Sequence, residues 1–288
     1  MSGNTSPEPP LPLSTTESPL ARTFRLCGEG GRVALVPYVC AGWPDRDGSL
    51  ALLRAAADAG ADVLELGIPV SDPLADGPTI QKASFQALEG GMTVREALEV
   101  LREFRGDRDT PVVLFTYLNP LYRFGVEAFV QAARDAGAQG LLVTDLPTGA
   151  DPELEGAIRA GGLDLIRLVA PTTRPERAGE VARGGSGFLY YISRTGVTGA
   201  RTELRGELAR ELELLRKAVD LPVAVGFGVS TPEQAALVAG MADGVVVGSA
   251  LIQAVEEGGV EGGKAFLRSL REAMDRTGAA KSNENVDC

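Results

Sequence analysis

The residues best suited to acid–base chemistry lie in residues 62–81, which read DVLELGIPVSDPLADGPTIQ. Glu65 lies within a short apolar run, where burial would disfavour the charged carboxylate and raise its pKa. Such a group can both give and take a proton near neutral pH. Asp76 lies between alanine and glycine in a proline-rich loop, and we expect a solvated, ionised carboxylate that faces the same site. Two carboxyl groups in different environments can divide the acid and base roles between them.

Each of these acids also has a structural interpretation. Glu65 could be a buried carboxylate paired with a lysine or arginine, although its apolar neighbours offer no such partner. Asp76 could bind backbone amide groups of its own loop, and this is the interpretation that we keep for Asp72. The chain contains no histidine, so proton transfer must fall to carboxylates, tyrosine or lysine.

Three segments in the last third of the chain place glycines directly after short apolar runs. They are residues 195–199, 226–230 and 248–250. Any one of them alone is ordinary turn chemistry. Together they match the phosphate site that (β/α)8 barrels build from backbone N–H groups and a helix N-terminus. We therefore expect a bound phosphate monoester, and without a P-loop lysine motif a nucleoside triphosphate is not implied.

Aromatic residues recur where the apolar runs end. Taken singly, each is more often part of a core than of a ligand site. Several of them at one end of a barrel could instead form a flat apolar slot between the acids and the phosphate site, and the substrate would then be an aromatic phosphate ester. The candidates are Tyr38, Phe115, Tyr117, Tyr190 and Phe227.

These residues must be positioned by an alternation of short apolar runs and longer amphipathic stretches. Runs that are apolar throughout indicate strands buried on both faces, in a parallel sheet covered by helices. The expected strands are residues 33–39, 63–66, 112–115, 140–144, 164–169, 188–192, 223–225 and 244–247. The expected helices include residues 50–59, 94–105, 126–136, 153–160, 175–182, 208–218, 232–239 and 264–276.

A repeated junction supports this alternation. ADAGADVLEL, RDAGAQGLLV, IRAGGLDLIR and LVAGMADGVV each end a helix at glycine and then enter a strand. Eight such units predict a single-domain (β/α)8 TIM barrel over residues 19–278. The alternative is an open doubly wound sheet, but the first strand leads into CAGWP and not into a GxGxxG turn. Residues 20–26 could form a helix at the barrel floor or an irregular lead-in.

Composition restricts the remaining possibilities. We expect residues 1–18 to form a disordered tail and residues 279–288 a flexible one. The net charge of -11 argues against nucleic acid as a partner. The three cysteines lack CxxC spacing, so we expect neither a disulfide framework nor a metal site. No run approaches the length of a membrane span, and we expect a cytoplasmic protein.

At this level of detail the motifs can be compared with a known family. LELGIPVSDPLADGPTIQ is similar to the signature of the tryptophan synthase alpha chain family, and YYISRTGVTG, VGFGVSTPEQ and GVVVGSALI resemble later segments of that family in the same order. The resemblance implies cleavage of indole-3-glycerol phosphate to indole and glyceraldehyde 3-phosphate for L-tryptophan biosynthesis, without cofactor or metal. Val70 and Phe115 depart from the residues common in the family, an aromatic and a smaller aliphatic respectively.

The resemblance also implies roles for individual residues. Glu65 corresponds to the group that protonates the indole ring at C3 and handles the glycerol hydroxyl proton, and Asp76 to the acid that binds the indole N–H. Tyr190 corresponds to a tyrosine near the catalytic glutamate, and Thr198 lies in a loop that closes over the substrate. The implied phosphate-binding residues are Gly199, Phe227, Gly228, Gly248 and Ser249, and we place Tyr38 and Phe115 in the indole pocket.

The family also implies a partner. Its alpha chains pass indole through a tunnel to a pyridoxal-phosphate beta chain in an αββα tetramer, and pyridoxal phosphate would belong to that beta chain. Two other functions stay open: a lyase that works without a beta chain, and a non-catalytic barrel that binds a phosphate ligand and regulates a partner. Co-purification with a beta chain would argue against the stand-alone lyase. The buried acid Glu65 argues against the non-catalytic barrel, because binding alone does not need such a group.

Overall fold

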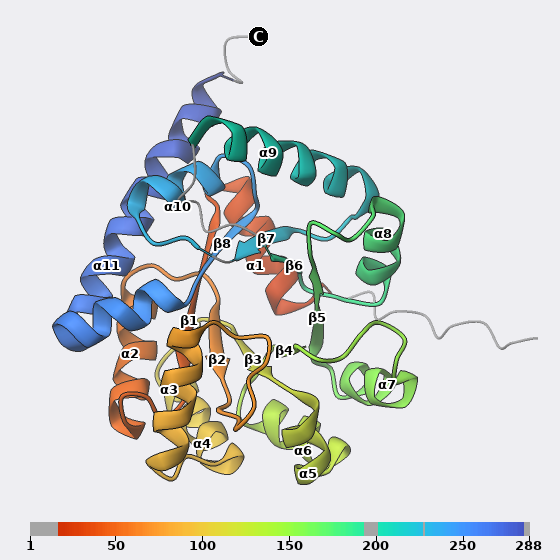
Figure 1. The fold of residues 1–288 in the computed structure, drawn as a ribbon, viewed down its shortest axis with the longest axis vertical. Coiled ribbons are helices and arrows are strands. Elements are labelled where there is room, and N and C mark those ends of the chain that lie inside the picture. The colour runs from red at the N-terminus through yellow and green to blue at the C-terminus, as the bar shows by residue number, and fades with distance from the viewer. Residues whose placement is uncertain (1–16, 193–200, 227, 285–288) are drawn as a thin grey trace, which may run out of the picture.

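The protein folds into a closed barrel of eight parallel strands, as Figure 1 shows. The computed structural model describes residues 17–192, 201–226 and 228–284. The strands pair in chain order, and the last pairs with the first, which closes the sheet and confirms the predicted (β/α)8 TIM barrel. The strands are β1 (Ala34–Cys40), β2 (Leu64–Gly67), β3 (Val112–Thr116), β4 (Gly140–Val143), β5 (Asp164–Val169), β6 (Leu189–Ile192), β7 (Val223–Gly226) and β8 (Gly244–Val247).

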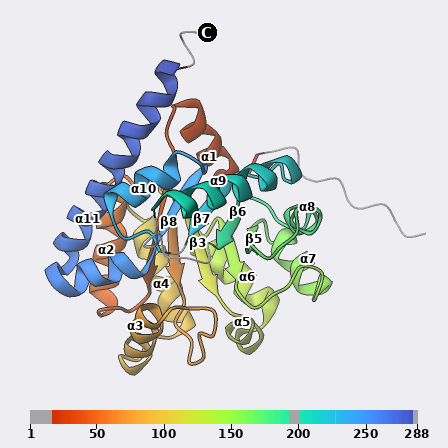
Figure 2. The same cartoon turned by 45° about the horizontal axis from the view of Figure 1, so that its top comes forward.

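Helices surround the barrel on its outside, as the turned view in Figure 2 makes clear. Every predicted strand is present with each end within one residue of its expected position, and every predicted helix is present. The helices are α1 (Pro19–Glu29), α2 (Arg46–Asp58), α3 (Pro78–Glu89), α4 (Val94–Arg105), α5 (Leu118–Phe124), α6 (Val126–Asp135), α7 (Pro152–Ala160), α8 (Pro175–Arg183), α9 (Arg201–Ala218), α10 (Pro232–Ala239) and α11 (Ser249–Glu284).

Several helices differ from the expected ranges for identifiable reasons. Helices α3 and α5 are additional, and α3 begins with Pro78 in its first turn, where no backbone N–H is needed. Helix α2 begins earlier because the side chain of Asp45 caps the N–H of Gly48 at 2.7 Å. Helix α11 is interrupted at Gly259, whose φ is 64°. It continues through residues 279–284, which were expected in the C-terminal tail, because alanine and lysine there favour helix.

The short helix α1 closes the floor of the barrel. Leu20 and Phe24 are buried among the inward-facing side chains of the strands. The ring centroids of Phe24 and Phe188 lie 4.9 Å apart. The first residues of β4 and β8 are glycines that make room for them. A Cβ at Gly140 would lie 2.7 Å from Leu20, and one at Gly244 would lie 2.9 Å from Phe24. The helical interpretation of residues 20–26 is therefore confirmed.

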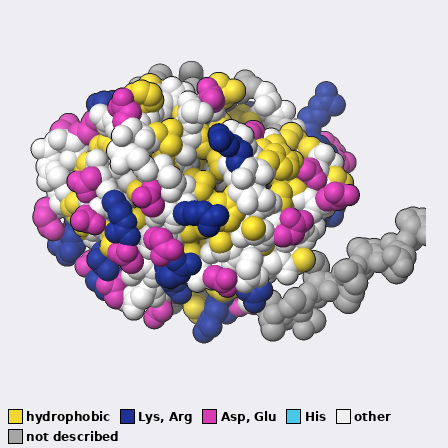
Figure 3. Space-filling view, turned by 90° about the horizontal axis from the view of Figure 1, so that it is seen from below, with side chains coloured by type: hydrophobic (Ala, Val, Ile, Leu, Met, Phe, Trp, Pro, Cys, Tyr) yellow, Lys and Arg dark blue, Asp and Glu magenta, His cyan; other side chains and the backbone are white. Residues whose placement is uncertain are grey.

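The surface mixes charges of both signs. On the face drawn in Figure 3, acidic and basic side chains are interspersed with hydrophobic ones. Within the described ranges no helix combines the length and the apolar character needed to cross a membrane. The most exposed large hydrophobic residue described is Leu74, at 91 %, in the loop between β2 and α3.

Candidate active site

Glu65 is a buried acid in the middle of the barrel wall. It lies in β2, in register with Tyr38 of β1 and Val113 of β3. Its side chain is only 1 % exposed, and Oε1 has no hydrogen-bond partner among the described residues. Burial, and to a smaller extent the nearby charge of Asp76, raises the pKa of Glu65 to about 8. The predicted buried carboxyl group is confirmed, and it is mostly protonated at neutral pH.

Asp76 faces Glu65 from the loop between β2 and α3. We expected a solvated carboxylate, but the side chain is half-buried. The reason is that the loop folds against Tyr117, whose hydroxyl accepts a hydrogen bond from the N–H of Ala75 at 3.1 Å. Burial raises the pKa of Asp76 to about 6, although a hydrogen bond from Tyr117 acts in the opposite direction. Asp76 is thus still mostly ionised at pH 7, and the two acids differ in protonation state.

Two tyrosines pack across the ends of neighbouring strands. The hydroxyl oxygen of Tyr38 would lie 2.1 Å from a Cβ at Gly67, and that of Tyr190 would lie 2.2 Å from a Cβ at Gly226. Strands β2 and β7 must therefore end in glycine for these rings to occupy their positions. Burial raises the pKa of both tyrosines well above the usual value, so both hydroxyl groups keep their protons.

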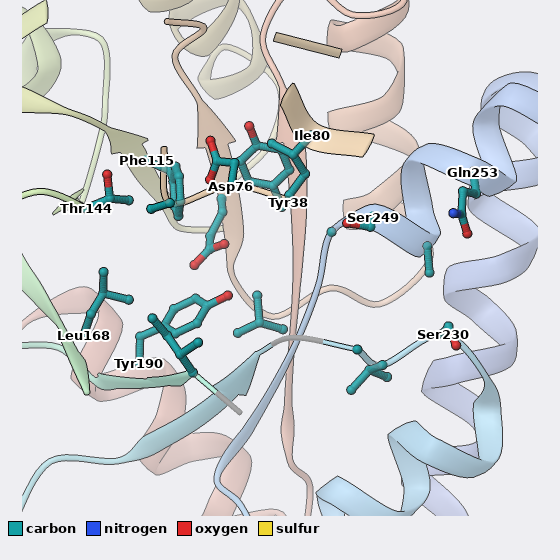
Figure 4. A pocket seen from close by; sticks show the side chains of 18 residues that line it. Tyr38, Asp76, Ile80, Phe115, Thr144, Leu168, Tyr190, Ser230, Ser249 and Gln253 are labelled. Atoms are coloured by element: carbon teal, nitrogen blue, oxygen red, sulfur yellow. The ribbon is translucent and has the colours of Figure 1, made fainter. Parts of the chain in front are cut away.

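These groups line a cavity of about 280 Å³. Figure 4 shows Asp76, Tyr38 and Tyr190 toward one end of it, where Phe115 packs edge to face on Tyr38 with 5.4 Å between ring centroids. Ser249 lies toward the other end in the same view, together with Ser230 and Gln253. The predicted residues that line the cavity are Tyr38, Glu65, Asp76, Phe115, Tyr190, Gly228, Gly248 and Ser249.

The far end of the cavity is formed by the start of a helix. Gly248 immediately precedes α11, and its carbonyl accepts from the N–H groups of Leu251 and Ile252. The N–H groups of Ser249 and Ala250, at the very start of the helix, have no carbonyl of the same helix to donate to. Such an N-terminus favours an anion, through both its free donors and the helix dipole. Gly228 contributes a turn with φ of 84°, a conformation that suits glycine.

Some lining residues were not predicted, and three predicted ones lie outside the described residues. Thr144 and Gln253 line the cavity without having been predicted, and Ser230, which also lines it, belongs to the segment 226–230 that was expected in the phosphate site. Helical spacing could have identified Gln253, because it lies four residues after Ser249 and hence on the same helix face. The predicted residues that the structure does not describe are Thr198, Gly199 and Phe227. In the described part of the chain no group of three or more His, Cys, Asp or Glu side chains could hold a metal ion.

The fold and the cavity define a TIM-barrel enzyme equipped for acid–base chemistry. The sequence model of the family described as tryptophan synthase alpha chain matches residues 24–281. The alpha chain of Azoarcus sp. (strain BH72) is 47 % identical over 263 residues, which cover 90 % of this chain and 97 % of that protein. That of Gluconacetobacter diazotrophicus is 50 % identical over 258 residues, 89 % of this chain and 94 % of that protein.

Solved structures agree. Tryptophan synthase subunit alpha from Legionella pneumophila str. Paris has a TM-score of 0.84 and 36 % identity, covering 91 % of this chain and all of that one (100 %). A chain of Mycobacterium tuberculosis tryptophan synthase has a TM-score of 0.82 and 38 % identity, covering 90 % and 99 %. The chain therefore belongs to the tryptophan synthase alpha chain family, a family of lyases in tryptophan biosynthesis.

Proposed function

We propose that this chain cleaves indole-3-glycerol phosphate to indole and D-glyceraldehyde 3-phosphate, as the alpha subunit of a tryptophan synthase. The observation that carries the proposal is the pair of unequal acids in one cavity: Glu65 with a pKa of about 8 beside Asp76 with a pKa of about 6. At neutral pH this pair offers a proton donor and a carboxylate at the same time. Retro-aldol cleavage of an indole requires both.

Proton transfer by Glu65 accounts for both halves of the reaction. The protonated carboxyl group gives its proton to C3 of the indole ring, and positive charge then develops at the ring nitrogen. The resulting carboxylate takes the proton of the hydroxyl group on the carbon attached to C3. The bond between that carbon and C3 breaks, its electrons return to the ring, and the carbon becomes an aldehyde. Glu65 is protonated again at the end of the cycle.

Asp76 stabilises the intermediate charge in this scheme. Its carboxylate accepts a hydrogen bond from the ring N–H and offsets the positive charge that develops there. Tyr190 lies close enough to both acids for their charges to raise its pKa, which supports a place beside the reacting atoms. Tyr38 and Phe115, which pack on each other, would form an aromatic wall of the cavity against which the ring lies, and this supports an aromatic substrate.

The opposite end of the cavity would hold the phosphate group. This end is lined by two glycines, Gly228 and Gly248, whose lack of a side chain lets a ligand approach the backbone closely. Ser249 adds a hydroxyl group at the start of α11. We assign the same function to Gly199 and Phe227, and closure of the loop over substrate to Thr198. This arrangement orients the substrate so that its indole ring reaches Glu65.

We further propose that the chain works with a pyridoxal-phosphate beta chain in an αββα tetramer in the cytoplasm. Family membership supports the beta-chain partner. Indole released in the barrel would be consumed by that partner, and pyridoxal phosphate would be bound by the beta chain.

The decisive experiment measures indole release from indole-3-glycerol phosphate by the purified chain, alone and with a beta chain added. We expect slow release alone and a strong acceleration with the partner. Fast release that the partner leaves unchanged would indicate a stand-alone indole lyase. No release under either condition would contradict the lyase function and favour a phosphate-binding regulator.

A further inference from the structure

Tyr117 connects the loop that carries Asp76 to the end of a neighbouring strand. It follows β3 directly and precedes α5, and its side chain is 6 % exposed. Its hydroxyl oxygen accepts the hydrogen bond from the N–H of Ala75, at 3.1 Å. A buried phenol from a distant part of the sequence thus holds the backbone of Ala75, the residue next to Asp76.

The proton of the same hydroxyl group can be donated to a neighbouring side chain. The oxygen accepts from Ala75, and two side chains, Thr144 and Asp76, lie close enough to exchange a hydrogen bond with the hydroxyl group. The interaction with Asp76 lowers the pKa of that acid, as donation of the proton to its carboxylate would. Burial, with a contribution from the charge of Asp76, raises the pKa of Tyr117 to about 12. The phenol therefore remains a donor at every pH at which the enzyme would work.

None of the other titratable groups that the structure describes around Asp76 lowers its pKa. Glu65, Tyr38, Cys40 and Tyr190 all approach it closely enough for their charges to interact with its own. Each of these groups carries negative charge or none, so none of them favours an ionised Asp76. Among the described residues, Tyr117 is the one group that lowers the pKa of Asp76 against the effect of burial.

We propose that Tyr117 is a positioning residue for Asp76: its oxygen clamps the loop through Ala75, and its proton orients the carboxylate toward the cavity. This inference rests on the function proposed above for Asp76. Tyr117 does not line the cavity as described, so it acts through Asp76 and does not itself contact the substrate.

The test compares two variants that each lose one phenol hydroxyl. Tyr117→Phe keeps the ring and removes the clamp. Tyr122→Phe is the matched control, because the Tyr122 hydroxyl also donates to an aspartate, Asp151 at 2.6 Å, but on the exposed surface of α5. We expect Tyr117→Phe to lower kcat/KM for indole-3-glycerol phosphate at pH 7 roughly 10- to 100-fold, as for a lost hydrogen bond to a charged group. Tyr122→Phe should change it less than about twofold.

The pH profile separates positioning from a merely structural contribution. In Tyr117→Phe the acidic limb of the kcat/KM profile, which requires ionised Asp76, should move up by about one pH unit. The alkaline limb, which reports Glu65, should stay in place. A lowered melting temperature with an unshifted acidic limb would mean that Tyr117 only supports the fold, and would overturn the proposal.

A double-mutant cycle with Asp76→Asn completes the design, with single-turnover assays for the slow variants. If Tyr117 acts through Asp76, Tyr117→Phe should cost less than about threefold in the Asp76→Asn background. The same loss in both backgrounds would contradict the proposal. Full activity of Asp76→Asn alone would instead contradict the function proposed for Asp76, so the two failures can be distinguished.

Discussion

At the scale of single residues, the two acids differ because their surroundings differ. Glu65 could be predicted as buried because its neighbours in sequence are apolar. The half-burial of Asp76 could not, because it depends on Tyr117, which lies 42 positions from Ala75 in the chain. The raised pKa values follow from removal of water around each carboxyl group, which disfavours the charged form.

Replacing Glu65 should separate binding from catalysis. Glu65→Gln keeps the size of the side chain but cannot exchange its proton, so we expect kcat to fall at least 10²- to 10⁴-fold. Binding of a substrate analogue, measured by calorimetry, should change less than about threefold because the phosphate end is untouched. Asp72→Asn, in the exposed part of the same loop, is the control and should retain full activity. Retained cleavage by Glu65→Gln would remove Glu65 from the mechanism.

The same pair predicts a bell-shaped dependence of kcat/KM on pH. Activity requires ionised Asp76, which is lost as the pH falls through about 6. It also requires protonated Glu65, which is lost as the pH rises through about 8. The maximum should therefore lie near pH 7. Because the two acids interact, the apparent pKa values of the two limbs describe the pair and not either residue alone. A profile of kcat, in which the substrate is already bound, controls for titration of its phosphate group; a flat profile would contradict the assignment.

At the scale of secondary structure, the strands and the helix ends that precede them were easier to predict than the additional helix α3. Strands were located well because continuous apolar runs and glycine at helix ends identify buried parallel strands. Helix α3 was missed because Pro78 and the preceding prolines suggest a loop, whereas proline in a first turn is compatible with a helix. The glycines that end β2 and β7 could not be explained from sequence, since the rings that cross them lie on other strands.

Those strand-end glycines give a prediction of their own. In Gly226→Ala the new methyl group would lie 2.2 Å from the hydroxyl oxygen of Tyr190, so the ring must move. We expect a loss of stability of about 1–3 kcal/mol in urea denaturation, with reduced kcat, because the site is overpacked. Gly156→Ala, at an exposed position of α7 with nothing within 4 Å, is the control and should stabilise the protein by about 0.5–1 kcal/mol. Equal effects of the two substitutions would contradict the close approach.

At the scale of the whole molecule, the charge distribution opposes an anionic substrate. The net charge is -11, and the carboxyl groups that line the described cavity are those of Glu65 and Asp76, of which Asp76 is the one mostly ionised at neutral pH. Attraction of a phosphate ester therefore depends on neutral donors at the start of α11 and not on a long-range field. The barrel could be predicted from its eight repeated units. The sequence did not show that the phosphate group would be bound by neutral donors, with the cavity's carboxyl groups elsewhere in the same site.

This distribution predicts an unusual response to salt. Raising sodium chloride from about 20 to about 200 mM should screen the repulsion and leave KM unchanged or lower it up to about threefold. Steady-state kinetics of indole release would measure this, with inhibition by uncharged indole as the control that salt should not affect. A KM that rises several-fold with salt would mean that a cationic side chain binds the phosphate group.

The helix at the barrel floor has a consequence for the timing of turnover. Among the described residues, Leu20 and Phe24 fill one end of the barrel, so we expect molecules to enter and leave across the rim formed by the loops after the strands. Substrate and products then use the same opening and cannot pass through it at the same time. We therefore expect a partner protein that collects the product to dock at this rim, where Leu74 is exposed. Such a partner would limit the entry of the next substrate molecule while it is bound.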